Sequence, residues 1–166
     1  MQKLPDVCGI TIAAIALSAF APSAFAEEII SMSTCQVVGG SAPEPLGDRE
    51  GHSIQFDEVS CRVESGPLSG GVLTGTDIWE WSGTDAVSLA NNGIVRKPGA
   101  TAVYQNTEAK ITLTIADGKV TGFVASGKGF WPMATGGAAI LAGKSCTYTA
   151  KPAGPAGQFT AESKCE

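Results

Sequence analysis

Six residues between positions 77 and 131 have side chains suited to binding or catalysis: Trp79, Trp81, Asp77, Arg96, Tyr104 and Trp131. Tryptophan and tyrosine rings present wide apolar surfaces, and a carboxylate or guanidinium among them orients a ligand through a few polar contacts. Asp77 shares a strand face with Trp79 and Trp81, because residues two apart in a strand point to the same side. Inside a barrel these side chains either fill the interior, which we expect first, or line a cavity for a small apolar ligand.

Asp77 and Glu80 flank Trp79, an arrangement that suggests the paired carboxylates and aromatic platform of a glycosidase. Three residues apart in a strand, however, the two carboxylates point to opposite faces and do not meet at one substrate. His52 is the only histidine, and no G-x-S-x-G sequence offers it a nucleophilic serine. We expect His52 to be a solvated loop residue, and we assign no catalytic residue.

The glycine-rich segments do not predict a nucleotide site. Residues 122–128 fit G-x-x-x-x-G-K, but Gly129 stands where magnesium binding needs serine or threonine, and the stretch is predicted as strand. No C-x-x-C sequence is present to hold a metal together with the single histidine. We predict neither a cofactor nor a metal.

The first 26 residues have the features of a secretory signal peptide. Lys3 precedes an apolar stretch that ends at Phe20, and residues 24–26 form a small-x-small cleavage site. We expect 1–26 to be removed, leaving a single domain, 27–166, that is periplasmic or secreted.

Charge and hydropathy exclude several partners. The net charge of −5 and the lack of a basic run argue against binding to nucleic acid or anionic lipid. No later apolar stretch reaches the roughly 20 residues of a membrane helix, so we expect no membrane insertion after signal cleavage. A small apolar ligand or a protein partner remains.

Four cysteines, Cys35, Cys61, Cys146 and Cys165, remain after signal removal. An even number in an exported chain predicts two disulfides. We prefer the pairing of Cys146 with Cys165, which lie in the two arms of a predicted C-terminal hairpin, and of Cys35 with Cys61. The rival pairing joins Cys35 to Cys165 and Cys61 to Cys146, and would suit a barrel closed by its first and last strands.

The clearest single element is a β-hairpin over residues 111–124. Apolar residues alternate with threonines from 111 to 115, and Asp117-Gly118 supplies the two positive φ angles of a type I′ turn. A two-residue turn sets the register, which predicts that Leu113 faces Gly122 across the hairpin.

Short strands are expected along the rest of 27–166, with turn signals every eight to twelve residues. No helix is predicted there, because glycines crowd the one candidate helical turn at 138–141. We interpret Asn91-Asn92-Gly93 as a hairpin turn between two strands, and Pro132 as an edge or a strand end. Gly75 and Gly122 inside strands permit the sharp coiling of a small barrel. We predict an all-β domain, a single antiparallel β-barrel of about eight strands, with a β-sandwich as the alternative.

The exported all-β layout and the glycine-rich sequence ATGGAAILAGK at 134–144 resemble the small bacterial barrels of the allene oxide cyclase and dirigent-like group. The resemblance covers the second half of the chain. It implies an antiparallel barrel with an apolar cavity, and no catalytic residue of that group is carried over.

Three functions are consistent with these expectations. The first is an exported barrel that binds a small apolar ligand or a protein partner without catalysis. The second is a cyclase or isomerase that shapes a substrate in a barrel cavity, with Asp77, Arg96 or Tyr104 as polar handles. The third is a structural or interaction protein that uses an exposed sheet edge near residues 130–132. A cavity with an inward ionisable group favours the first two, and a packed interior favours the third.

Overall fold

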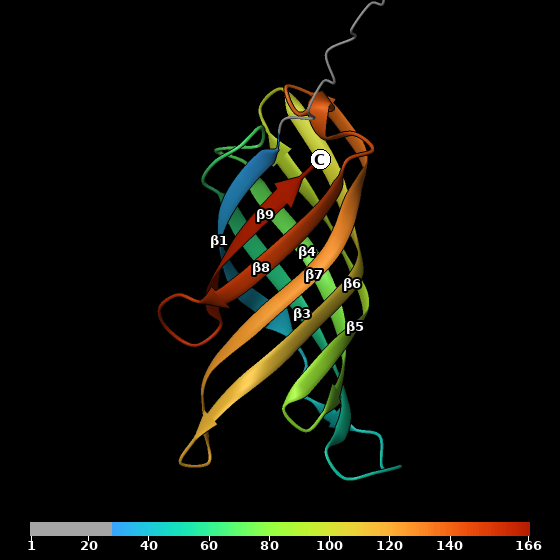
Figure 1. Ribbon diagram of the computed structural model, residues 1–166, viewed down its shortest axis with the longest axis vertical. Coiled ribbons are helices and arrows are strands. Elements are labelled where there is room, and N and C mark those ends of the chain that lie inside the picture. The colour runs from blue at the N-terminus through green and yellow to red at the C-terminus, as the bar shows by residue number, and fades with distance from the viewer. Residues whose placement is uncertain (1–27) are drawn as a thin grey trace, which may run out of the picture.

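The computed structural model describes residues 28–166, so the predicted signal peptide lies outside the described residues. Nine strands and one 3₁₀ turn make up this part of the chain (Figure 1). They are β1 (Ile29–Gly40), β2 (Glu44–Pro45), β3 (His52–Val63), β4 (Val72–Ser82), β5 (Asp85–Lys97), β6 (Ala100–Ala116), β7 (Lys119–Gly136), η1 (Ala139–Leu141), β8 (Ser145–Pro152) and β9 (Gln158–Cys165). Among residues 28–166, no helix is long and apolar enough to cross a membrane.

Eight of the strands form a closed antiparallel barrel in which each strand pairs with its neighbours in the chain. The order runs β1-β3-β4-β5-β6-β7-β8-β9, and β1 pairs with both β3 and β9 to close the ring. The two-residue β2 adds to β3 outside this ring. Such an order needs only short hairpin connections, which the frequent turn residues supply. The predicted barrel is confirmed, and the alternative of a sandwich is wrong.

The β6–β7 hairpin has the predicted turn but a different register. Asp117 and Gly118 have φ angles of 52° and 70°. A bulge at Thr121 then shifts the pairing by one residue, so that Leu113 lies opposite Phe123 and Gly122 lies opposite Thr114. A one-residue shift exchanges the faces of a strand. The inner face of β7 therefore carries Phe123 rather than the predicted Gly122.

Residues 91–93 do not form the predicted hairpin turn, because β5 runs through them without interruption. Asn91 is only 7% exposed, and Gly93 lies opposite Gly75 in the β4–β5 ladder. An Asn-Gly pair predicts a turn because glycine tolerates positive φ. At Gly93 the missing side chain instead allows another residue to approach the backbone closely.

Pro132 lies within β7 rather than at its end. Pairing of β7 with β8 stops at Phe130, so Pro132 has no ladder partner on that side, as its missing N–H requires. The backbone of Trp131 is nevertheless bonded to Lys144 and Gly143. The exposed sheet edge expected at 130–132 is therefore already occupied by this chain.

Both disulfides join residues directly opposite each other on paired strands. The sulfur atoms of Cys35 and Cys61 are 2.11 Å apart across β1 and β3, and those of Cys146 and Cys165 are 2.00 Å apart across β8 and β9. The preferred pairing is confirmed. The rival is wrong although β1 and β9 do close the barrel, because Cys35 lies opposite Phe159 there. Two disulfides are consistent with an oxidising environment.

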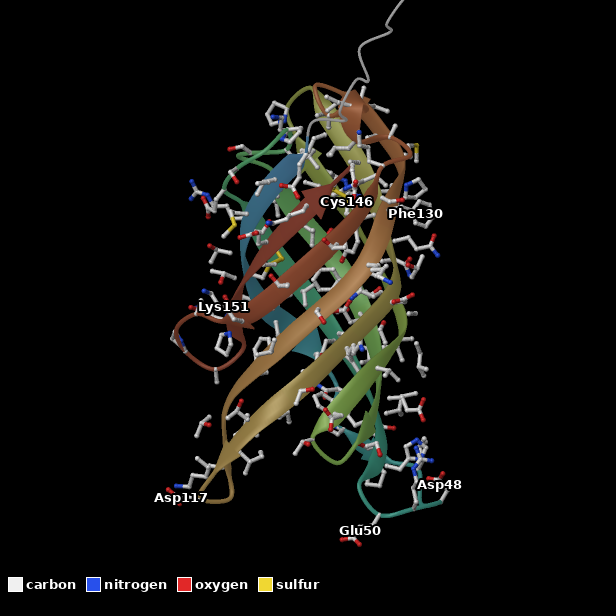
Figure 2. The ribbon with its side chains drawn as sticks, viewed as in Figure 1. Asp48, Glu50, Asp117, Phe130, Cys146 and Lys151 are labelled. Atoms are coloured by element: carbon white, nitrogen blue, oxygen red, sulfur yellow. A yellow bond between two sulfur atoms is a disulfide. The ribbon has the colours of Figure 1, made fainter. Side chains whose placement is uncertain are left out.

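One end of the barrel is filled with apolar side chains. The turn η1 covers this end (Figure 1), and its Leu141 is 1% exposed. Leu141 packs in a core with Leu68 and Val95. The opposite end carries the β6–β7 turn with Asp117 and the loop with Asp48 (Figure 2). The two ends of the barrel therefore differ in construction.

Candidate ligand-binding cavity

Beyond this core the interior of the barrel is hollow. A cavity of about 330 Å³ lies among the strands, a volume within the range of small-molecule sites. Part of its wall consists of Ala125, Ala150 and Ala161 on β7, β8 and β9. These short side chains do not reach the opposite wall, so space remains between the strands. The expectation that aromatic side chains fill the barrel solidly is wrong.

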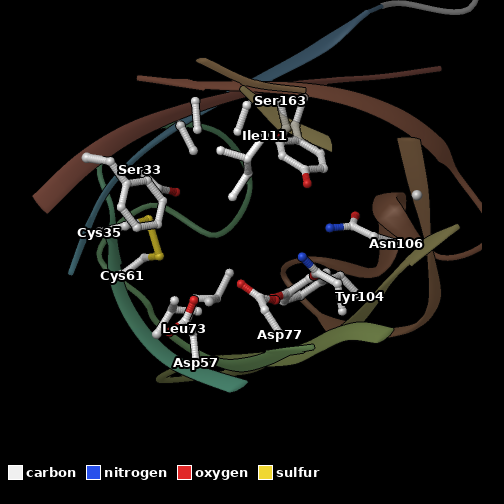
Figure 3. A pocket seen from close by; sticks show the side chains of 18 of the residues that line it. Ser33, Cys35, Asp57, Cys61, Leu73, Asp77, Tyr104, Asn106, Ile111 and Ser163 are labelled. Carbon is white, nitrogen blue, oxygen red and sulfur yellow. A yellow bond between two sulfur atoms is a disulfide. The ribbon is translucent and has the colours of Figure 1, made fainter. Parts of the chain in front are cut away.

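Three polar side chains lie side by side in the cavity wall, one from each of three neighbouring strands. Asp77 on β4 lies directly opposite Asp57 on β3 and Asn91 on β5. All three line the cavity, and Asp77 and Asn91 are only 8% and 7% exposed. Figure 3 shows the carboxyl group of Asp77 pointing into the enclosed space. We call these three residues the acceptor row, because each presents a carboxyl or amide oxygen.

The acceptor row contains buried atoms without partners. Among the described residues, Asp77 Oδ1, Asn91 Oδ1 and Trp81 Nε1 are buried and have no hydrogen-bond partner. Asp57 differs, since Gln55 Nε2 donates a hydrogen bond to its Oδ1 at 2.8 Å. An unpaired buried polar atom costs about 1 to 3 kcal/mol. At a cavity wall such atoms are placed to hydrogen-bond a molecule that occupies the cavity.

Burial controls the ionisation of the cavity. Burial, and secondarily the nearby carboxyl of Asp57, raise the pKa of Asp77 to about 7. Burial also raises the pKa of Asp57, and the hydrogen bond from Gln55 opposes this. The pKa values of Tyr104 and Tyr148 are raised by burial first and by the charge of Asp77 second. The cavity therefore holds one carboxyl group that exchanges its proton near neutral pH.

Glycines in the strands make room for the two tyrosines. A Cβ at Gly75 would stand 2.5 Å from the hydroxyl oxygen of Tyr104, and one at Gly93 would overlap the same ring. Tyr148 covers Gly127 in the same way. The rings lie flat against backbone that carries no side chain, an arrangement that only glycine permits. The sequence analysis gives Gly75 a role in strand coiling. The structure shows that it also makes room for the cavity residue Tyr104.

Five of the six predicted site residues line the cavity: Trp79, Trp81, Asp77, Tyr104 and Trp131. Tyr104 and Trp131 pack edge to face, with ring centroids 5.9 Å apart and planes at 67°. Arg96 does not line the cavity: it is exposed, and its neighbour Val95 is fully buried. Alternate residues of β5 point to opposite faces, so the prediction that Arg96 is an inward polar handle is wrong.

Several further polar cavity residues escape the sequence analysis, among them Asp57, Asn91, Asn106 and Tyr148. Asp57 is two residues from the buried Val59, and Tyr148 is two from the buried Ala150. This period of two is the signal that could have placed both inside. Asn91 gives no such signal because a bulge in β5, at Leu89, precedes it.

His52 lies at the end of the barrel away from η1, where β3 begins. Its Nδ1 contacts Asp48 Oδ1, and its Nε2 lies 2.8 Å from Glu80 Oε1. Arg49 bridges the same two carboxylates. The hydrogen bond to Asp48 is the main cause that raises the pKa of His52. At 7% exposed, His52 is not the solvated loop residue expected, whereas Glu80 faces away from Asp77 as predicted.

No group of three or more His, Cys, Asp or Glu residues within 28–166 is arranged to hold a metal ion. A scan against protein-family models found no match, and a search of curated proteins found none. The resemblance to the allene oxide cyclase and dirigent-like barrels stays a prediction. The argument for function therefore rests on the cavity.

Proposed function

We propose that this protein is an exported β-barrel that binds a small, mostly apolar ligand in its interior without catalysing a reaction. In this proposal residues 1–26 direct export, and the mature chain works in the periplasm or outside the cell. The two disulfides support such an oxidising compartment.

The observation that carries the proposal is the hollow interior of the barrel. Its wall is mainly apolar and aromatic, with a few polar groups that converge on the enclosed space. This combination is typical of small-molecule sites, in which apolar surface supplies affinity and a few polar atoms supply orientation. The core around Leu141 closes one end of this cavity.

The protein carries its own reporter of binding. It has three tryptophans, Trp79, Trp81 and Trp131, and all three line the cavity. A molecule that enters the barrel therefore contacts the indole rings directly and changes their surroundings.

The test is a titration of the oxidised protein with N-phenyl-1-naphthylamine, a neutral apolar fluorophore that accepts energy from tryptophan. We expect a saturable signal at one site per chain. Ala150→Phe, which places a ring in the cavity, is expected to weaken binding about tenfold or more. Thr149→Phe, on the outer face of the same strand, is the matched control and is expected to bind as the parent does.

Absence of a saturable signal from the parent protein would reject the proposal. Equal binding by Ala150→Phe and the parent would reject it too. If Ala150→Phe fails to fold, Ala125→Phe, which places a ring in the same cavity from β7, replaces it in this comparison.

A second candidate is a cyclase or isomerase that uses the same cavity. The observation in its favour is Asp77, a buried carboxyl whose pKa of about 7 suits proton transfer at neutral pH. Asp77→Asn separates the two functions. A binding protein would change only its affinity, whereas an enzyme would lose turnover of its bound substrate.

A further inference from the structure

The acceptor row has no cation to balance it. Of the residues in 28–166 that line the cavity, none is Lys, Arg or His, whereas Asp57 and Asp77 both are carboxylic acids. They lie opposite each other on β3 and β4. Two carboxylates this close in a buried site repel each other, and neither has a positive partner in the wall. The missing charge is one that a ligand can supply.

The row is also short of donors. Asp77 Oδ1 and Asn91 Oδ1 are unpaired acceptors, and each belongs to a side chain that is more than nine-tenths buried. Asp57 has one oxygen engaged by Gln55. An ammonium group carries three N–H donors and no acceptor. It therefore matches three neighbouring acceptor groups in both number and sign.

Aromatic rings surround the same space. Trp79, Trp81, Tyr104 and Tyr148 all line the cavity. The faces of such rings attract cations, and this attraction strengthens when water is excluded. Rings and carboxylates together are suited to an amine with an apolar body, since the rings contact both parts of such a molecule.

We infer that the ligand of this barrel is a protonated amine with an apolar or aromatic body, whose ammonium group binds between Asp77, Asp57 and Asn91. The inference rests on the proposed function, because it names the chemical class of the ligand for the same cavity. Asp77 binds as a carboxylate, so a protonated Asp77 releases its proton to solvent when the ammonium group arrives. The other titratable groups that face it are Asp57, Tyr104 and Tyr148.

A neutral ligand fits less well. An alcohol carries one donor for the acceptor row, and its acceptor lone pairs match the unpaired Nε1 of Trp81 rather than the row. It would leave at least one oxygen of the acceptor row without a partner, and it would not offset the charge of the two carboxyls. Carboxylic acids and phosphates would add negative charge to a cavity that already has two acidic groups.

The test compares 2-phenylethylamine with 2-phenylethanol, which share one body and differ in the polar group. Each competes with N-phenyl-1-naphthylamine at about pH 7.5, where the amine is protonated. We expect the amine to bind about tenfold or more tighter than the alcohol. In Asp77→Asn this preference should disappear, because the amine loses affinity more than the alcohol does. Asp117→Asn, at the exposed β6–β7 turn, removes the same charge and should keep the preference.

Calorimetry in two buffers of different ionisation enthalpy provides a second measurement on the parent protein. Near pH 6.5, below the pKa of Asp77 at about 7, we expect amine binding to release a proton and alcohol binding to release none.

The two proposals fail in different ways. If the fluorophore binds but the alcohol competes as well as the amine, the amine inference is overturned and the binding function stands. Retention of the full amine preference by Asp77→Asn overturns the inference as well. If the fluorophore itself does not bind, the proposed function fails first.

Discussion

The closed end of the barrel and its hollow middle are built from the same strands, but their interiors are filled differently. At the closed end Val95 on β5 and Leu141 on η1 are 0% and 1% exposed, and both belong to one apolar core. Four residues before Val95 along β5, Asn91 is buried with an unpaired oxygen. The comparison shows that one strand contributes a fully buried apolar side chain at one position and a buried, unpaired polar group to the same cavity wall at another.

Side-chain size explains the difference. At the closed end η1 places Leu141 in an apolar core with Leu68 and Val95, where it is 1% exposed. In the middle, alanines at 125, 150 and 161 face the acceptor row without filling the space. Polar groups are tolerated there because the core at the other end supplies stability.

The largest effect is expected at the closed end. Leu141→Ala should lower the free energy of unfolding by about 2 to 5 kcal/mol, because it opens a void in a packed core. Ile140→Ala, 61% exposed on the same turn, is the control and should change stability by about 0.5 kcal/mol or less. Urea denaturation measures both. If Leu141→Ala lowers the free energy of unfolding as little as Ile140→Ala does, the core at the closed end is not a main source of stability.

Replacing Asp77, in the hollow half, should raise the free energy of unfolding at pH 8 rather than lower it. Its pKa rises from 3.8 to about 7 on folding, so the folded state binds more protons than the unfolded state between these values. Stability should therefore fall as pH rises from about 4 to 7, by up to roughly 4 kcal/mol. Asp77→Asn should flatten this dependence and raise stability at pH 8. An unchanged pH profile in the variant would show that Asp77 is not buried as described.

An effect of intermediate size on stability is expected at Gly93, which lies against the ring of Tyr104. Gly93→Ala places a methyl group against the Tyr104 ring and 2.8 Å from the carbonyl oxygen of Thr74, and should cost about 1 to 3 kcal/mol. At Gly122 the nearest atom to an added Cβ is 3.9 Å away. Gly122→Ala is therefore expected to be neutral or slightly stabilising. Thermal unfolding of the pair decides whether Gly93 is required for the approach of Tyr104.

The smallest effect concerns His52 at the end away from η1. Its pKa is raised on folding, first by the hydrogen bond to Asp48. Its stabilising contribution is therefore complete below the unfolded value of 6.5 and is lost as pH rises through the raised folded value. His52→Gln should lower the melting temperature by a few degrees at pH 5.5 and by less at pH 9. Melting curves in the Asp77→Asn background isolate this effect, and equal losses at both pH values would contradict it.

Several features followed from the sequence because they depend on neighbours in the chain or on directly paired residues. The turn at Asp117-Gly118 depends on two residues. The common face of Asp77, Trp79 and Trp81 depends only on the alternation of one strand. These predictions needed no knowledge of how distant strands align.

Other predictions failed where a bulge or a distant partner decided the outcome. The bulge at Thr121 moved Phe123 inward in place of Gly122. The face predicted for Arg96 failed because it depended on the course of β5 beyond the bulge at Leu89. An extra residue in a strand leaves no clear mark in the sequence, yet it reverses every face that follows.

By itself the sequence determined that this chain forms antiparallel strands, pairs its cysteines two by two, and sets an acidic residue among tryptophans on β4. The strands are longer than the short ones predicted, up to 18 residues in β7. Only the tertiary structure decided that the interior is hollow and that Asp57, Asp77 and Asn91 meet there. If Leu89 paired with Ile78 instead of bulging out, Ala90 would stand opposite Asp77. The physical reason is that strand faces are local, whereas the register between strands, and the space that remains inside, belong to the closed barrel.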